Sequence, residues 1–181
     1  MKIKIDKDSF LKALQKVGNA ISTRNTLPIL SNILLKAKDQ KLTIIGTDLE
    51  IRVTTTVEAN VEEEGEITVP AKKILTLVSK FRAKEISLES VENFHSRIKC
   101  GNTSALLVGL DPSGFPVYNQ SEFLRSFKLN QMDVFTFLER ISYAVSIQDS
   151  RVQLQGILLS LKNGKFVAVA TDGKRLAMCE K

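Results

Sequence analysis

Tryptophan is absent from this chain of 181 residues, and histidine and cysteine are scarce. The two cysteines, Cys100 and Cys179, lie far apart and form no Cys-x-x-Cys pair. We therefore expect reduced, buried thiols, without a metal site or a disulfide framework. The single histidine, His95, lies among charged residues in a probable strand. We expect its side chain to face solvent and to act neither as a catalytic base nor as a metal ligand.

Long apolar runs and catalytic signatures are also lacking. No stretch approaches the roughly 20 apolar residues that cross a bilayer, and the alternating start Met1–Asp6 has no signal-peptide core. Phosphate-binding loops and the patterns GxGxxG, GxSxG and HExxH do not occur. The acidic run Glu62–Glu64 is expected to be an exposed turn. These absences predict a cytosolic protein with no catalytic residue, no metal, no cofactor and no membrane partner.

Positive charge is in modest excess, with 26 Lys and Arg against 20 Asp and Glu and a formal net charge of +6. Such an excess favours an anionic partner only weakly, because many basic proteins bind no nucleic acid. The distribution of the charge along the chain is therefore more informative than its sum.

Three segments have the apolar spacing of amphipathic helices; Asp6 and Asn130 can cap the first and the third, and Pro70 precedes the second. The first is expected to begin after Asp6, the second to run from about Ala71 to Phe81, and the third to begin after Asn130. Their apolar stripes are Phe10, Leu14, Val17 and Ile21; Ile74, Leu75, Val78 and Phe81; and Val134, Leu138, Ile141 and Val145. The other faces of the first two helices carry Lys12, Lys16, Lys72, Lys73 and Lys80.

Strand patterns fill the intervals between these helices. Residues 50–58 alternate strictly between apolar or Thr side chains and polar ones, which is typical of a half-buried strand. Shorter candidates are Lys2–Asp6, Ile29–Ala37, Lys41–Gly46, Glu66–Val69, Glu85–Glu89, Phe94–Cys100 and Ser104–Gly109. The order of one strand, one helix and three strands occurs twice without long crossovers. It predicts an α+β fold with antiparallel sheets and helices on one face.

The chain repeats itself at an offset of 124 residues, without gaps. Thr47–Asp48 falls on Thr171–Asp172, Ile33–Leu35 falls on Ile157–Leu159, and the cap Asp6 falls on the cap Asn130. Chance matching of two amphipathic helices would explain the apolar matches. It would not place the Thr-Asp pair, the caps and the strands at one offset, so we infer two copies of one domain.

The repeat and the proline-containing stretch Leu110–Ser121 suggest the domain boundaries. We expect a first domain over residues 1–118 and the first half of a second domain over residues 119–181. The second copy stops soon after its third strand, which would leave an open sheet edge of the kind that proteins usually avoid. We therefore expect the sequence to be incomplete.

Six motifs, taken in chain order, resemble those of the bacterial DNA sliding clamp family, the β subunit of DNA polymerase III. They are Thr26–Leu35, Gly46–Ile51, Thr68–Lys72, Asp111–Pro116, Ser142–Ser146 and Ala170–Ala177. Each motif is weak alone, but the resemblance extends in order along all 181 residues and agrees with the domain repeat.

The resemblance implies a DNA clamp fold of repeated β-α-β-β-β units, with antiparallel sheets outside and helices lining the inner face. Two subunits of three domains each would close head to tail into a homodimeric ring around duplex DNA. Such a processivity factor would tether the α subunit of the polymerase III core, the clamp loader and other proteins with a clamp-binding motif. It would lie in the cytoplasm with the nucleoid.

Three sites follow from carrying the family pattern over residue by residue. The DNA-facing residues would be Arg24, Lys72, Lys73, Gln148 and Arg151. The peptide-binding pocket would comprise Leu154, Thr171, Gly173, Lys174, Arg175 and Leu176, with Lys174 where the family often has His. The dimer interface would comprise Ile74, Val78, Ala105 and Leu107. Lysines without aromatic stacking platforms can attract phosphates without reading bases, which suits sliding.

Each of these sites also has a plainer interpretation. The lysines can be an ordinary solvated helix face, the Thr-Asp-Gly-Lys motif a strand-end turn, and the interface residues part of a buried core. Two other functions stay open. One is a metal-dependent phosphodiesterase with Asp48, Glu50 and Asp172 as ligands, and the other is a DNA-binding module that forms no ring.

Overall fold

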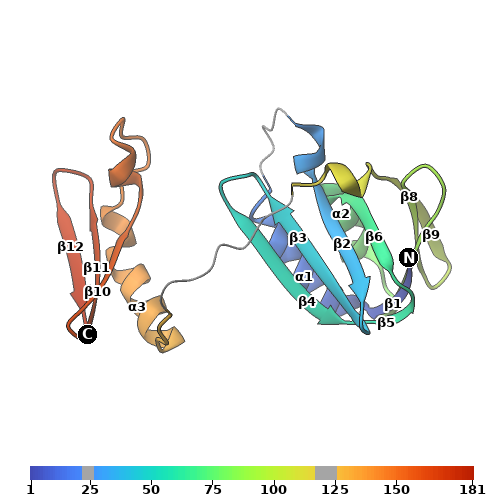
Figure 1. Cartoon of the computed structure of the whole chain (residues 1–181), viewed down its shortest axis with the longest axis horizontal. Helices are drawn as coiled ribbons and strands as arrows, with labels where there is room; N and C mark the ends of the chain where they lie inside the picture. Colours follow the sequence, from blue (N-terminus) through green and yellow to red (C-terminus); the bar gives the residue numbers. More distant parts are fainter. Residues whose placement is uncertain (22–26, 117–125) are drawn as a thin grey trace. The chain divides into compact units, whose positions relative to one another are not determined.

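The computed structural model describes residues 1–21, 27–116 and 126–181, and the chain divides into two compact units, Met1–Asn119 and Gln120–Lys181 (Figure 1). The first unit contains the helices α1 (Lys7–Gly18) and α2 (Ala71–Lys80). Its strands are β1 (Lys2–Asp6), β2 (Asn32–Lys38), β3 (Lys41–Thr47), β4 (Arg52–Glu58), β5 (Asn60–Glu63), β6 (Gly65–Pro70), β7 (Glu85–Ser90), β8 (His95–Cys100) and β9 (Thr103–Val108).

These strands form two antiparallel sheets, in the orders β5-β1-β7-β8-β9 and β4-β3-β2-β6. Helices α1 and α2 contact each other, and in Figure 1 they lie behind the sheet β4-β3-β2-β6. The predicted α+β plan with antiparallel sheets is confirmed. The strand β5, which the sequence analysis missed, is an addition to the expected order.

The core of the first unit explains why α1 and α2 form where they do. Asp6 begins α1 by accepting a hydrogen bond from the backbone N–H of Ser9 at 2.8 Å, which also lowers the pKa of its carboxyl group. The predicted stripe side chains Phe10, Leu14 and Val17 are buried, whereas Ile21 follows the end of the helix and is half-buried. On α2, Ile74, Val78 and Phe81 are buried and Leu75 is half-buried.

The acidic run at residues 62–64 is exposed, as predicted, but it is not a turn. Glu62 and Glu63 belong to β5, which pairs with β1 and so places Glu62 beside two lysines. The Glu62 carboxylate lies 2.7 Å from Lys2 Nζ and 3.0 Å from Lys4 Nζ. These two hydrogen-bonded ammonium groups lower the pKa of Glu62. The acidic side chains therefore contribute to the sheet edge.

The second unit contains α3 (Gln131–Ile141) and the sheet β10-β11-β12, with strands Leu158–Lys162, Lys165–Thr171 and Leu176–Glu180. Asn130 caps α3 by accepting from the Met132 backbone N–H at 2.9 Å. The predicted stripe of α3 was partly wrong, because Phe137 is buried and Leu138 is exposed. Phe137 stacks on Phe166 at a centroid distance of 5.7 Å, and the predicted stripe residues Val134, Ile141 and Val145 belong to or pack against the same core.

The repeat is visible in the strand registers. In the first unit Leu34 pairs with Ile45, and in the second unit Leu158 pairs with Val169. Both positions of the second pair lie 124 residues after those of the first. The two units therefore share their hairpin register, residue for residue.

The two cysteines and the single histidine have structural positions in the sheets. Cys100 is buried, and its thiol donates to the Ala83 carbonyl at 3.4 Å, whereas Cys179 is half-buried; both are free thiols. His95 begins β8 and is half-buried, on the strand face of the exposed Arg97 and Lys99, with Nδ1 at 2.7 Å from the carbonyl oxygen of Asn93.

Candidate functional site

The lysines of α1 and α2 lie on exposed faces whose opposite sides build the core. Lys12 and Lys16 on α1 and Lys72 and Lys73 on α2 are all exposed. Ala13, Val17, Ile74 and Val78 on the same helices are buried. Because burial on one side fixes the rotation of each helix, it also fixes the direction in which these ammonium groups point.

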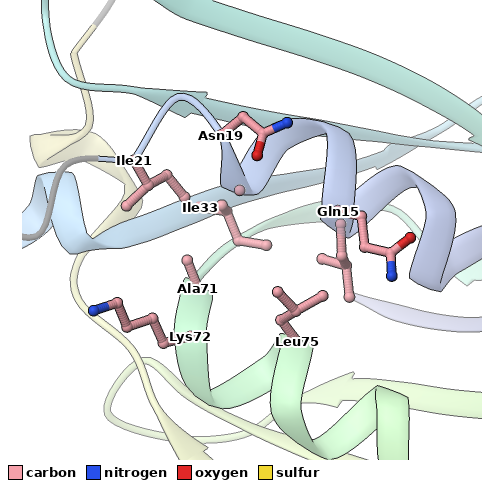
Figure 2. A pocket seen from close by; sticks show the side chains of 9 residues that line it. Gln15, Asn19, Ile21, Ile33, Ala71, Lys72 and Leu75 are labelled. Atoms are coloured by element: carbon pink, nitrogen blue, oxygen red, sulfur yellow. The ribbon is translucent and has the colours of Figure 1, made fainter.

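A cavity of about 430 Å³ lies between the two helices. Figure 2 shows Ile33, Ala71 and Leu75 between α1 and α2, with the amides of Gln15 and Asn19 and the ammonium of Lys72 at the edge. The edge groups can donate hydrogen bonds to phosphate oxygens, whereas the apolar side chains cannot hydrogen-bond to bases. Gln15 and Asn19 were not among the residues predicted from the sequence, although both follow the lysines of α1 at helical spacing.

The other predicted DNA-facing residues are arranged differently. Arg24 lies outside the described residues, and Gln148 is exposed. Arg151 is exposed but paired, because its Nε and Nη2 donate to the two carboxylate oxygens of Asp149 at 2.9 and 2.8 Å. This bidentate pair lowers the pKa of Asp149 to about 2 and raises that of Arg151. A phosphate would have to compete with Asp149 for this guanidinium group.

Arg151 also lies against the predicted peptide-binding turn. A Cβ atom added at Gly173 would be 2.9 Å from Arg151 Nη2. Gly173 has φ +84°, a left-handed conformation that a side chain disfavours. The structure therefore brings a residue predicted to contact DNA beside one predicted to contact peptides.

The Thr-Asp turn has one geometry in both units. Thr171 Oγ1 donates to the Arg175 carbonyl at 2.6 Å, and Asp172 Oδ1 accepts from the N–H groups of Lys174 and Arg175. In the first unit Thr47 and Asp48 make the equivalent bonds around Ile51. The third turn residue is left-handed in both, with φ +81° at Leu49 and +84° at Gly173. The strand-end turn is thus real in each copy.

The side chains on this second turn combine charge and apolar surface. The Arg175 guanidinium lies over the Tyr143 ring at 5.4 Å, and its Nε donates to Asp172 at 3.0 Å. Lys174 is exposed, Leu176 is 65% exposed and Leu154 is half-buried. An apolar side chain of a partner could contact Leu154 and Leu176, while Arg175 anchors a polar group.

The predicted interface residues need correction. Ile74 and Val78 are 0% exposed because they pack into the core of the first unit, so their side chains offer no surface to another subunit. Leu107 is buried and Ala105 is half-buried. The exposed apolar side chains of β9, at one edge of its sheet, are Leu106 and Val108.

The aspartates considered as metal ligands serve as turn caps. The carboxylates of Asp48 and Asp172 each accept backbone N–H bonds within their own unit. Within the described part of the chain, no group of three or more His, Cys, Asp or Glu side chains is arranged to hold a metal ion. None of the described helices has the length and hydrophobicity that a membrane crossing requires.

Comparison with known proteins covers the chain almost completely. Residues 1–119 match the N-terminal domain, and residues 128–181 the central domain, of the DNA polymerase III beta subunit. The beta sliding clamp of Pseudomonas aeruginosa is 36% identical over 180 residues, which are 99% of this chain and 49% of that protein. The chain thus spans about half the length of the curated relatives it matches.

Solved structures agree with this comparison. The crystal structure of the DNA polymerase III subunit beta from Pseudomonas aeruginosa has a TM-score of 0.94 at 35% identity, covering 100% of this chain and 50% of that one. The DNA polymerase sliding clamp from Bacillus subtilis has a TM-score of 0.95 at 25% identity, again with 100% and 50% coverage.

Proposed function

Since the chain belongs to the DNA polymerase III beta subunit family, we propose that it is part of a DNA sliding clamp. The complete ring would encircle duplex DNA and tether the replicative polymerase as a processivity factor. Residues 1–118 would form the first clamp domain and residues 119–181 the first half of the second. This role requires only that positively charged side chains lie close to the DNA. We propose no catalytic residue and no cofactor.

The observation that carries this proposal is the exposed lysine face of α1 and α2. This face comprises the exposed Lys12, Lys16, Lys72 and Lys73, opposite the buried side of their helices. Lys72 lines the same cavity as the amides of Gln15 and Asn19. Ammonium and amide groups attract the phosphate backbone of any sequence, whereas sliding requires that no base edge be held. Gln148 and Arg151 would add contacts from the second unit, and Arg24 remains a proposed contact of the first.

A second proposed surface docks the polymerase α subunit, the clamp loader and other proteins with a clamp-binding motif. It comprises Leu154, Thr171, Gly173, Lys174, Arg175 and Leu176. The left-handed Gly173 allows a partner backbone to approach closely, and the exposed Leu176 offers apolar surface. The ring would act in the cytoplasm, on the nucleoid.

The proposed subunit contact uses the edge strand β9. A strand at a sheet edge presents unpaired backbone groups that can pair with another strand. Leu106 and Val108, more than half exposed, would add apolar contact, whereas Leu107 belongs to the core of the first unit and the half-buried Ala105 packs against that core. The homodimer would close through this edge.

Retention on DNA tests the clamp proposal. The full-length protein, loaded by its clamp loader, should remain on nicked circular DNA and leave linear DNA of the same sequence through the ends. Replacing Lys72 and Lys73 by Gln should weaken DNA binding equally on unrelated sequences, and each lysine lost should reduce the salt slope by about 0.9.

Lys41→Gln with Lys99→Gln is the matched control, because these exposed lysines lie on the strands β3 and β8. The control should bind DNA like the wild type. Equal retention on circles and linear molecules would contradict a ring, and sequence-dependent loss would contradict backbone attraction.

A further inference from the structure

The segment that follows β9 folds back onto the first unit. Thr68, which is buried, fixes its start: the Thr68 hydroxyl donates to the Leu110 carbonyl at 2.6 Å and accepts from the Leu110 N–H at 2.8 Å. A short 3-10 turn, Pro112–Gly114, follows, with Asp111 Oδ1 accepting from the Ser113 N–H at 2.9 Å. In Figure 1 this turn lies in front of the sheet β4-β3-β2-β6.

This turn delivers Phe115 to the sheet face opposite the helices. Phe115 is 3% exposed and packs in one cluster with Leu34 and Ile45. Their strand neighbours Leu35 and Ile44 belong to the main core, and successive side chains of a strand point to opposite faces. Arg52 Nη1 then donates to the Pro116 carbonyl at 3.4 Å. A Phe-Pro pair is thus held by an apolar site and a guanidinium group.

In the second unit, the strand face equivalent to the one that Phe115 covers is exposed at Leu158. By the offset of 124 residues, Leu34 corresponds to Leu158, Ile45 to Val169 and Arg52 to Leu176. Leu158 is 64% exposed, whereas Leu34 is 5% exposed. Leu176 is itself part of the proposed peptide-docking surface. The strand face that Phe115 covers in one unit therefore adjoins a docking surface in the other.

We propose that Phe115–Pro116 is a built-in ligand of the first unit, occupying a groove formed by Leu34, Ile45 and Arg52 that adjoins that unit's copy of the peptide-docking surface. The occupant is the chain's own segment, and its bound state closes the groove to other peptides. A cavity of about 440 Å³, lined in part by Leu34, Arg52 and Phe115, remains beside it. The relation to a docking surface rests on the function proposed for the second unit, whereas the position of Phe115 and Pro116 rests on their contacts with Leu34, Ile45 and Arg52.

The sequence of the bound segment therefore shows which chemical groups the groove binds. The groove takes an aromatic ring on Leu34 and Ile45, followed by a proline whose carbonyl accepts from Arg52. A tethered segment reaches an effective concentration on the order of millimolar, so a free peptide of the same sequence competes poorly with it. Removing the Phe115 ring should remove this competition.

The test uses the 181-residue chain with Phe115→Ala and a free peptide of the sequence Asp-Pro-Ser-Gly-Phe-Pro. Methyl NMR signals of Leu34 and Ile45 should shift on titration into the variant, and at least tenfold less at equal peptide concentration in the wild type. A peptide with Ala in place of Phe should leave both signals unmoved. Phe115→Leu, which keeps an apolar side chain and so the fold, should give intermediate shifts.

Equal shifts in wild type and variant, shifts confined to other residues, or binding of the Ala peptide would each overturn the proposal. If Phe115→Ala does not fold, absence of binding to Phe115→Leu overturns it as well. The titration contains no DNA and no polymerase-derived peptide. Its failure would therefore leave the clamp proposal untouched, and failure of the DNA experiment would leave the self-docked segment in place.

Discussion

At position 109, directly after β9, the backbone passes between two carbonyl groups. A Cβ atom there would lie 2.1 Å from the Thr68 carbonyl oxygen and 2.5 Å from that of Phe94. Both neighbours are backbone atoms, which cannot rotate away as a side chain can. We therefore predict that Gly109→Ala lowers the free energy of unfolding of the first unit by about 3 kcal/mol, the upper end of overpacking costs.

Urea denaturation of the variant measures this loss. Gly18→Ala is the control, since a methyl group there meets no heavy atom within 4 Å among the described residues. It should change the free energy of unfolding by less than about 1 kcal/mol. Equal effects of the two substitutions would contradict the steric argument.

Asp149 allows a prediction about pH. Its folded pKa of about 2 lies below the ordinary value of 3.8, because Arg151 donates side-chain and backbone hydrogen bonds to it. The pair therefore contributes its full stabilisation above about pH 4 and loses it as the pH falls through about 2. An NMR titration of the Asp149 carboxyl carbon should give a midpoint near 2.

Replacing Arg151 by Gln should raise that midpoint toward 3.8, but not fully, because the backbone N–H at position 151 still donates to Asp149. Glu139→Gln, a substitution on α3, should leave the midpoint unchanged. A midpoint that stays near 2 in the Arg151 variant would show that the guanidinium group is not the cause.

At the scale of elements, the turn between β11 and β12 carries the proposed docking function. Replacing Leu154 and Leu176 by Ala should weaken binding of a polymerase-derived clamp-binding peptide to the full-length protein by at least tenfold. Each leucine side chain that a bound peptide buries contributes about 1.5 kcal/mol or more to the free energy of binding. Isothermal titration calorimetry measures the change. Met132→Ala, an equally exposed apolar position on α3, should bind like the wild type.

Periodicity predicted α2 to within one residue, and the local Asp6 cap predicted the start of α1, because one side of each helix is buried. The stripe residue Ile21 lies beyond the end of α1. The stripe of α3 was wrong only at Leu138; Phe137, which the prediction left out, stacks on Phe166, a residue far away in the sequence. The strand β5 was missed for a related reason: its acidic residues are stabilised by lysines of β1.

In the candidate sites, too, features held by local contacts could be predicted from the sequence and features held by long-range contacts could not. The Thr-Asp turns could be predicted from four residues, because their hydrogen bonds are local. The burial of Ile74 and Val78 had already been indicated by their helical spacing, and the family resemblance led away from it. The burial of Phe115 could not be predicted from the irregular segment, since its partners Leu34 and Ile45 lie about 70 to 80 residues earlier in the sequence.

At the scale of the whole molecule, the two units differ in how much apolar surface they bury. The described core of the second unit contains six buried residues, whereas the core of the first extends over both sheets and both helices. Leu158, Leu159 and Leu161 in β10 are exposed, although the equivalent residues of β2 are buried. Hydrophobic burial is the main favourable contribution to folding, so the second unit should be the less stable one.

We predict that the 181-residue chain unfolds in urea in two transitions, with amides of β10–β12 exchanging with deuterium before those of β2 and β3. Phe166→Ala should lower only the first transition, and Ile86→Ala only the second, since each side chain is buried in one unit. A single transition shifted by both substitutions would show that the two units fold together.

The separation of lysines and core on α1 and α2 has an evolutionary consequence. Since Lys72 and Lys73 share a helix with Ile74 and Val78 but occupy different faces, a lineage could add or lose surface cations there without repacking the interior. The proposed affinity for a polyanion can therefore change through these lysines, while the stability that the buried residues provide is retained.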